Sequence, residues 1–295
     1  MIICFLGPEG TSDYRALSLL RSHLNLEPLP MSSLIDVIET VNFTPGCLGI
    51  IPIENSTDGQ MTTILDKLIF DFENVMIREE VVLAERIDAF CLDPNVQAST
   101  VISHPLILDL CSQYIKAQSL TTRHSLSTAE ACRTILEDND PTAIALAPQI
   151  VGESFGLELV SNGVMDVSDI RTRYFVIGRE ISEKTGSDRT SIVVTPTLDR
   201  VGFLADVATV FAKNGVNMNH ILSRPLSAKI GTYCFHIVLE GHMGDPGVVA
   251  LMDDLLELDA SIKLLGSYPR WSGVDVATPA SNLPKGSIER VGAKI

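Results

Sequence analysis

Four places in the first half of the chain combine polar or glycine residues with the start of a helical pattern. These places are Gly10-Thr11-Ser12, Asn55-Ser56, Ser103-His104 and Ser127-Thr128. A helix N-terminus carries unpaired N–H groups and partial positive charge, so four such starts around one cleft would hold a small anion such as a carboxylate. Each start also fits an ordinary N-cap, because Ser, Thr and Asn are favoured at that position in any helix.

Arg173 and His104 are the two other side chains that invite a chemical role. Arg173 interrupts an otherwise apolar extended segment, Thr172 to Phe175, where a permanent charge needs either an anionic substrate or a buried salt-bridge partner. His104 precedes Pro105, so it fits a general base but fits a helix cap better. The sequence alone leaves both choices open.

Several classes of active protein lack their minimum residues here. The chain has no glycine-rich phosphate loop, no G-x-S-x-G and no H-E-x-x-H. Its six cysteines are scattered in apolar segments without a C-x-x-C pair, which predicts reduced thiols and no structural zinc. Nucleotide-binding, hydrolase and metalloenzyme functions are therefore disfavoured, and we expect no cofactor.

Composition restricts the partners and the location. Twenty-two basic residues against 37 acidic ones give a net charge of −15, which has the wrong sign for binding nucleic acid. The start of the chain lacks a signal-peptide pattern, and no apolar run approaches the roughly 18 residues that cross a bilayer. We expect a cytoplasmic protein without a membrane or nucleic-acid partner.

Strand and helix patterns alternate along the first part of the chain. Apolar runs at 2–6, 48–51, 100–103 and 143–147 predict buried strands, and helical apolar spacing follows each of the first three. Ser127 and Glu130 have the capping-box spacing of another helix start. The order predicts an α/β fold with mainly parallel strands. Extended segments at 75–92 and 156–178 suggest two crossings between two lobes, with ligands in the cleft between them.

A different order of elements follows a polar stretch near residue 185. About 80 residues read as strand, helix, two strands, helix and strand, the βαββαβ order of small ligand-sensing modules. The expected boundaries are lobes 1–76 with 162–180 and 77–161, a linker at 181–189, a second domain at 190–271 and a disordered tail at 272–295.

The motifs taken together resemble the prephenate dehydratase family, from the first strand to about Trp271. The first domain carries Gly7-Pro8-Glu9-Gly10-Thr11, Ile51-Pro52-Ile53-Glu54-Asn55-Ser56, Ser103-His104-Pro105 and Thr172-Arg173-Tyr174 in the family's order. The second domain resembles the family's ACT module, with Gly202, Ser223-Arg224-Pro225 and Leu265-Gly266-Ser267-Tyr268-Pro269. The resemblance implies a two-lobed dehydratase domain of the type II periplasmic-binding-protein kind and a ferredoxin-like ACT regulatory domain.

The resemblance also implies a reaction, the loss of water and carbon dioxide from prephenate to give phenylpyruvate in phenylalanine biosynthesis. It assigns Thr172 as the proton donor to the leaving hydroxyl and Arg173 as a carboxylate clamp. It assigns substrate binding to Thr11, Asn55, Ser56, Ser103, His104, Ser127, Thr128 and Tyr174. A threonine hydroxyl is a weak acid, so this role makes sense only where aromatisation drives the loss of hydroxide.

The ACT resemblance implies an amino-acid effector, expected to be phenylalanine, at an interface of a homo-oligomer, a dimer or a tetramer. The effector residues it implies are Val201, Gly202, Phe203, Leu204, Asn217, Leu222, Ser223, Arg224 and Pro225. The chain departs from the family pattern at Ser12, Asp13, Leu106, Ile170 and Tyr174 in the first domain and at Phe203 and Leu222 in the second. These departures leave the exact substrate and effector open.

Three alternatives stay open at this point. The chain is an arogenate dehydratase, or a prephenate decarboxylase that keeps the ring hydroxyl, or an amino-acid sensor without catalysis. The Thr172-Arg173 pair argues against the last two of these alternatives.

Overall fold

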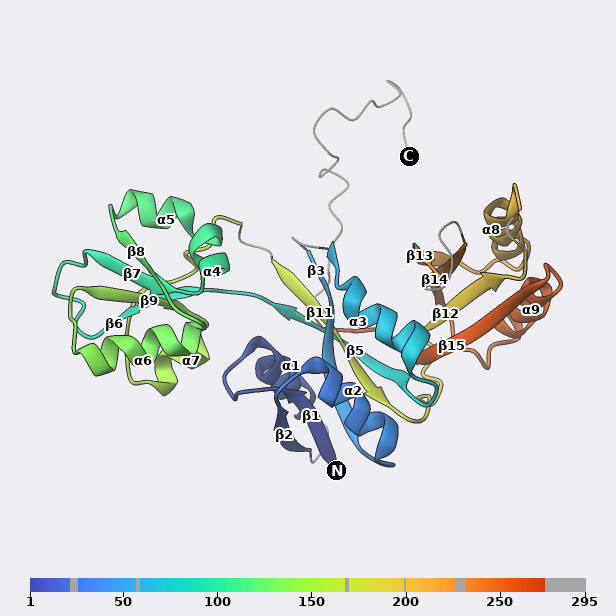
Figure 1. The fold of residues 1–295 in the computed structure, drawn as a ribbon, viewed down its shortest axis with the longest axis horizontal. Helices are drawn as coiled ribbons and strands as arrows, with labels where there is room; N and C mark the ends of the chain where they lie inside the picture. The colour runs from blue at the N-terminus through green and yellow to red at the C-terminus, as the bar shows by residue number, and fades with distance from the viewer. Residues whose placement is uncertain (22–25, 57–58, 168–169, 199, 227–231, 274–295) are drawn as a thin grey trace, which may run out of the picture.

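A computed structural model describes residues 1–21, 26–56, 59–167, 170–198, 200–226 and 232–273. Three bodies lie in a row along the longest axis of the molecule: a second lobe, a central first lobe and a C-terminal domain (Figure 1). The tail expected at 272–295 falls almost wholly outside the described residues. None of the described helices is long and apolar enough to cross a membrane.

The first lobe is built on strands from both ends of the segment 1–178. Its strands are β1 (Ile2–Leu6), β2 (Glu27–Met31), β3 (Leu48–Asn55), β4 (Gly59–Gln60), β5 (Met76–Ala84) and β11 (Arg171–Gly178). Its helices are α1 (Ser12–Arg21), α2 (Leu34–Phe43), α3 (Thr62–Asp66) and the π-helix η1 (Lys67–Asp71). Strands β1, β2 and β3 are parallel, whereas β11 runs antiparallel between β3 and β5.

The second lobe is inserted between β5 and β11 and has its own sheet. Its strands are β6 (Asp88–Cys91), β7 (Thr100–Ser103), β8 (Thr121–His124), β9 (Ala143–Ala147) and β10 (Glu158–Ser161), in the order β10-β6-β9-β7-β8. Its helices are α4 (Pro105–Leu110), α5 (Ser112–Ala117), α6 (Thr128–Asp138) and α7 (Gln149–Ser154).

The two expected crossings between the lobes are present, but the first lies later in the chain. Because β5 pairs with β11 along its whole length, it belongs to the first lobe up to Ala84. The boundary expected at residue 77 is therefore wrong, since an extended segment was mistaken for a connection when it is a central strand. The return crossing lies between β10 and β11, as expected.

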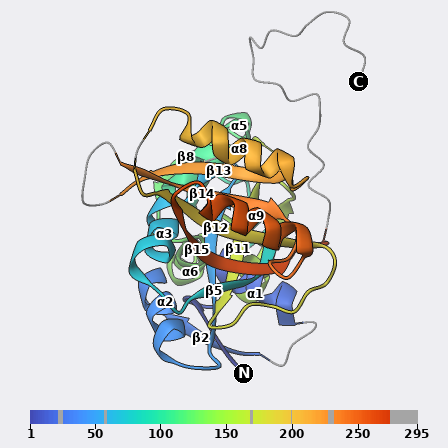
Figure 2. The ribbon, with the colours of Figure 1, turned by 90° about the vertical axis from the view of Figure 1, so that its right-hand side faces the viewer.

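The C-terminal domain has the expected βαββαβ order. It contains β12 (Asp188–Pro196), α8 (Phe203–Lys213), β13 (Met218–Pro225), β14 (Tyr233–Glu240), α9 (Pro246–Leu256) and β15 (Ala260–Pro269). Its strands follow the order β13-β14-β12-β15, and α8 and α9 lie over one face of this sheet (Figure 2). The described chain thus has an α/β fold with two lobes and a ferredoxin-like domain.

The first lobe and the C-terminal domain share one continuous sheet, because β15 pairs with β5 where Gly266 meets Ile77. The sheet face not covered by α8 and α9 packs on the first lobe. There Lys263 Nζ donates to three carbonyl oxygens at the end of η1, and Arg224 forms an ion pair with Asp66. The C-terminal domain is therefore joined to the first lobe by strands, side chains and a common core.

Candidate active site

A pocket of about 190 Å³ lies between the two lobes. Residues of both lobes and of the crossings line it: Gly10, Ser12, Asn55, Glu85, Ile87, Leu106, Ile107, Leu110, Thr128, Pro148, Met165, Ile170 and Thr172. We call this the interlobe pocket. It is the place where the sequence predicted that ligands would bind.

Thr172 is held in the pocket by two neighbouring strands. It lies opposite Asn55 across the β11–β3 pair, and Asn55 Nδ2 donates to Thr172 Oγ1 at 3.0 Å. The Thr172 hydroxyl in turn donates to Glu85 Oε1 at 3.2 Å. Two contacts from different elements therefore fix the one hydroxyl that the sequence analysis named as a proton donor.

Four helix N-termini meet at the pocket. Ser12 belongs to the first turn of α1, Leu106 to that of α4 and Thr128 to that of α6, while Pro148 precedes α7. Two of these helices, α1 and α6, come from opposite lobes, so their partial positive charges act on the same space. Three of these starts, those of α1, α4 and α6, are among the four that the sequence analysis named. The fourth is α7, because the helix that follows Asn55 begins only at Thr62.

Other expected substrate-binding residues have structural partners and do not line this pocket. Thr11 Oγ1 and Ser127 Oγ cap α1 and α6, and His104 Nδ1 caps α4. Ser56 Oγ accepts from the Arg171 amide at 3.0 Å, and the fully buried Ser103 donates to Leu146 O at 2.8 Å. Tyr174 is packed in the core under α1. The cap interpretation thus describes three of these six side chains, while Asn55, Thr128 and Thr172 reach the pocket.

Arg173 does not lie beside Thr172 in the pocket. Successive residues of a strand point to opposite faces of the sheet, so the two neighbours on β11 face different cavities. Arg173 forms ion pairs with Glu54 at 2.9 Å and with Glu80 at 2.7 Å, on the side that faces the C-terminal domain. The expected carboxylate clamp is therefore corrected to an ion pair between elements of the first lobe.

Glu85 is the functional candidate that the sequence analysis missed. It follows β5 at the crossing and is the one ionisable side chain among the described residues that line the pocket. Arg15 of α1 forms an ion pair with it at 3.0 Å, and Ser12 donates to it at 3.3 Å. An acidic residue directly after the apolar run 81–84 was the signal in the sequence that could have found it.

Asp13 lies in the first turn of α1 and is only 8% exposed. Burial is the main cause that raises its pKa to about 7, and the negative charge of Glu85 adds to the effect. Its Oδ1 has no hydrogen-bond partner among the described residues. A carboxyl group in the first turn of α1, outside the lining of the pocket, therefore stays partly protonated near neutral pH.

Replacing Asp13 with Asn is expected to stabilise the protein above neutral pH. The unfolded carboxyl releases its proton near 3.8 and the folded one near 7, so wild-type stability falls as pH rises between these values. At about 1.4 kcal/mol per pH unit the loss reaches at most about 4 kcal/mol. Urea unfolding of both proteins at pH 5 and pH 8 measures this loss of stability.

As a control, Asp36→Asn in the first turn of α2 is expected to lower stability at pH 8, because Ser32 and Ser33 lower the pKa of Asp36. Parallel pH profiles for Asp13→Asn and wild type would contradict the assignment.

The residues expected to bind an effector lie in the C-terminal domain, where several of them have structural partners. Val201 is fully exposed, Phe203 is 4% exposed and stacks on Phe235, and Arg224 is bound to Asp66. None of the nine lines the interlobe pocket, a cavity beside β8 of the second lobe, or a cavity between the first lobe and the C-terminal domain. The remaining six expected effector residues lie at the start of α8 and along or beside β13. They are Gly202, Leu204, Asn217, Leu222, Ser223 and Pro225.

Comparison with known protein families shows to which family the chain belongs. The family model for prephenate dehydratase matches residues 3–182, and that for the ACT domain matches residues 192–257. The chain belongs to the prephenate dehydratase family. It is 31% identical to the prephenate dehydratase of Methanocaldococcus jannaschii over 240 residues, 81% of this chain and 86% of the relative.

Solved structures agree with the fold. The prephenate dehydratase of Arthrobacter aurescens in complex with L-Phe is 29% identical, with a TM-score of 0.77 over 92% of this chain and 90% of that one. The prephenate dehydratase of Staphylococcus aureus, at 24% identity, has a TM-score of 0.78 over 91% of this chain and 100% of that one, and supports the fold alone. Three of the positions at which this chain departs from the dehydratase pattern, Ser12, Leu106 and Ile170, line the interlobe pocket.

Proposed function

We propose that this protein dehydrates and decarboxylates prephenate, giving phenylpyruvate, water and carbon dioxide. The observation that carries the proposal is the Thr172 hydroxyl, held by Asn55 and Glu85 inside a pocket on which helix N-termini of both lobes converge. Membership of the prephenate dehydratase family supports the same reaction.

For this reaction the site has to bind the negatively charged carboxylates of the substrate and to protonate the leaving hydroxyl. The helix starts at Ser12 and Thr128 offer N–H groups and partial positive charge to the carboxylates of the substrate. As carbon dioxide leaves, its bonding electrons make the ring aromatic and expel the hydroxyl, which takes a proton from Thr172 Oγ1. Asn55 Nδ2 then stabilises the threonine oxygen, because it already donates to that atom.

Product identification tests the proposal. Purified protein incubated with prephenate is expected to release phenylpyruvate and carbon dioxide, as shown by mass spectrometry. A product that keeps the ring hydroxyl indicates decarboxylation without dehydration. Binding of prephenate or phenylalanine without turnover indicates a sensor. Either result contradicts the dehydratase assignment.

Glu85 favours a second candidate, arogenate dehydration. Arogenate carries an ammonium group where prephenate carries a keto oxygen, and a carboxylate that lines the pocket attracts a cation and repels a dianion. No lining residue among those described supplies a full positive charge, and Arg15 is already paired with Glu85.

Replacing Glu85 with Gln is expected to lower the ratio of kcat/KM for arogenate to that for prephenate at least tenfold. The amide keeps an oxygen that accepts from Thr172 but loses the charge, and it frees Arg15 for a substrate carboxylate. Steady-state kinetics with both substrates measure the ratio. The exposed Glu153→Gln on α7 is the matched control and should leave it unchanged. An unchanged ratio in Glu85→Gln rejects the second candidate.

Regulation, assembly and location complete the proposal. We infer that phenylalanine acts on the ACT domain of a cytoplasmic homo-oligomer, supported by the ACT match and by the L-Phe complex of the Arthrobacter relative. Arg224 forms an ion pair with Asp66, and Phe203 stacks on Phe235. An effector that binds to Arg224 or Phe203 therefore has to displace these contacts or bind beside them. Activity assays with and without phenylalanine test the regulation, and light scattering tests the oligomeric state.

A further inference from the structure

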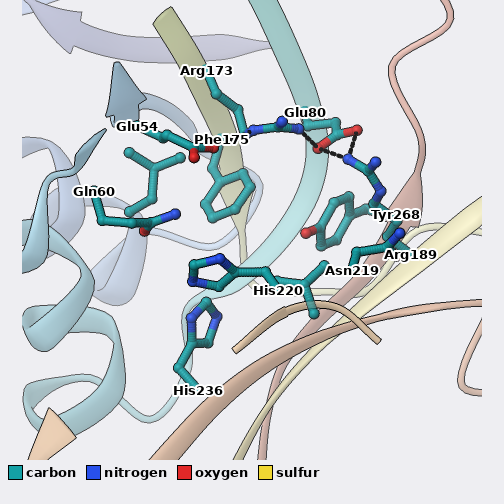
Figure 3. Close-up of a pocket in the computed structure, with 12 residues that line it drawn as sticks. Glu54, Gln60, Glu80, Arg173, Phe175, Arg189, Asn219, His220, His236 and Tyr268 are labelled. Carbon is teal, nitrogen blue, oxygen red and sulfur yellow. Dashed lines mark hydrogen bonds and ion pairs between the residues drawn. The ribbon is translucent and has the colours of Figure 1, made fainter. Parts of the chain in front are cut away.

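A second cavity, of about 130 Å³, lies at the junction between the first lobe and the C-terminal domain. We call it the junction pocket. Figure 3 shows that Glu54, Gln60, Arg173 and Phe175 approach it from the first lobe, whereas His220 and His236 approach it from strands β13 and β14. It is separate from the interlobe pocket, because Arg173 and Phe175 lie on the face of β11 opposite to Thr172.

The charged side chains around the junction pocket neutralise one another. Arg173 forms ion pairs with Glu54 and Glu80, and Arg189 forms an ion pair with Glu80 at 2.7 Å (Figure 3). Two guanidinium groups thus balance two carboxylates, and Glu80 is only 1% exposed. The pocket therefore has a rigid ionic rim without an excess charge of its own.

Several buried polar atoms around the same cavity lack hydrogen-bond partners. Among the described residues seven buried side-chain atoms are unpartnered, and four of them belong to residues that line this pocket. These four are Gln60 Oε1, Arg189 Nε, His220 Nε2 and His236 Nδ1. His236 is only 2% exposed, and its other ring nitrogen is bonded to Ser191 Oγ at 2.8 Å. An unpaired buried polar group destabilises the folded state, so the concentration of such groups at one cavity indicates a polar occupant.

The chemistry of these atoms specifies the occupant. Arg189 Nε can only donate a hydrogen bond, and the neutral rings of His220 and His236 can each present an N–H. Burial lowers the pKa of both histidines, that of His236 to about 3, so both are neutral at pH 7. In the tautomers that place the N–H on these two ring nitrogens, with His236 Nε2 accepting from Ser191 Oγ, three donors face the single acceptor Gln60 Oε1, which favours a ligand rich in acceptor atoms.

Apart from Asn219, whose side-chain amide donates to Glu240, the remaining wall of the junction pocket is apolar. It includes Ile53, Val238 and the rings of Phe175 and Tyr268, whose centroids are 5.6 Å apart. We propose that the junction pocket is a binding site for a small organic carboxylate with an apolar part. The carboxylate meets the ring nitrogens of His220 and His236, and the apolar part lies against the aromatic wall, on the side from which Tyr268 and Arg189 approach (Figure 3). This inference does not depend on the reaction at the interlobe pocket.

Benzoate is the probe for this site, with benzamide as a neutral analogue of the same shape and benzylamine as a cationic one. Calorimetric titration of the full chain is expected to show benzoate binding at least tenfold more tightly than either analogue. His220→Leu and His236→Phe should each weaken benzoate at least tenfold. His124→Leu, in a cavity of the second lobe, is the control and should bind benzoate as wild type does.

Histidine NMR keeps the test decisive if a variant does not fold. In wild-type protein labelled with ¹⁵N-histidine, saturating benzoate is expected to shift the ring resonances of His220 and His236. Equal affinity for benzoate and benzamide, weakening by His124→Leu instead, or unshifted resonances would each overturn the proposal. The last result would assign the unpartnered atoms to water alone.

Discussion

Replacing Thr172 with Ala is expected to lower kcat for prephenate by about 10²–10⁴-fold while changing KM only a few-fold. A positioned general acid contributes a rate factor of this size, equivalent to about 3–5 kcal/mol of transition-state stabilisation. The change removes the hydroxyl that Asn55 and Glu85 hold in the pocket, but it leaves the helix N-termini that meet the carboxylates in place. Steady-state kinetics with phenylpyruvate detection measure both constants.

Thr172→Ser is the matched control, because it keeps a hydroxyl on the same face of β11. We expect it to retain most of the turnover, whereas Thr172→Val keeps the shape without the hydroxyl and should behave like Ala. Thermal unfolding of all three variants separates loss of chemistry from loss of fold. Full activity in Thr172→Ala would show that the proton comes from another group.

The local elements of this site could be predicted because short-range contacts determine them. Ser127 and Glu130 predicted the start of α6, and in the structure Ser127 Oγ accepts from the Glu130 amide at 3.0 Å. Pro105 likewise occupies the first turn of α4. Both features depend on residues within one helical turn of each other, so the sequence contains the whole interaction.

The side-chain partners could not be predicted, because they depend on strand register and on distant segments. Adjacent residues in a motif suggested one site for Thr172 and Arg173, but the pleat of β11 sends them to different cavities. Glu85 meets Arg15 and Thr172 across 70 and 87 residues of chain, and no short motif records either contact. The family resemblance therefore predicted the reaction, whereas the structure was needed to show that the Glu85 carboxylate lines the interlobe pocket.

The junction of the two domains depends on one backbone approach. Gly266 of β15 lies opposite Ile77 of β5, at a bulge in the pairing of β15 with β12. A Cβ atom at Gly266 would lie 2.2 Å from Ile77 O and 2.6 Å from Ile77 N. Its φ of +155° is also one that residues with side chains rarely adopt. Any side chain here has to push the two strands apart, because backbone atoms cannot rotate away.

Replacing Gly266 with Ala is therefore expected to cost more than the usual 1–3 kcal/mol of an overpacked site, roughly 3–5 kcal/mol. The loss arises at the shared core, where Leu265 and Tyr268 pack with Ile77 and Phe175. Calorimetry is expected to show a first unfolding transition at a lower temperature than in wild type, separated from the unfolding of the rest of the protein. Protease cleavage between residues 178 and 188 should be faster than in wild type. Gly247→Ala on α9 is the matched control, because its Cβ would meet a single atom within 4 Å, at 3.9 Å, and alanine favours helix. A wild-type melting profile for Gly266→Ala would mean that β15 and β5 do not pair in solution, and the junction pocket would then lose one of its walls.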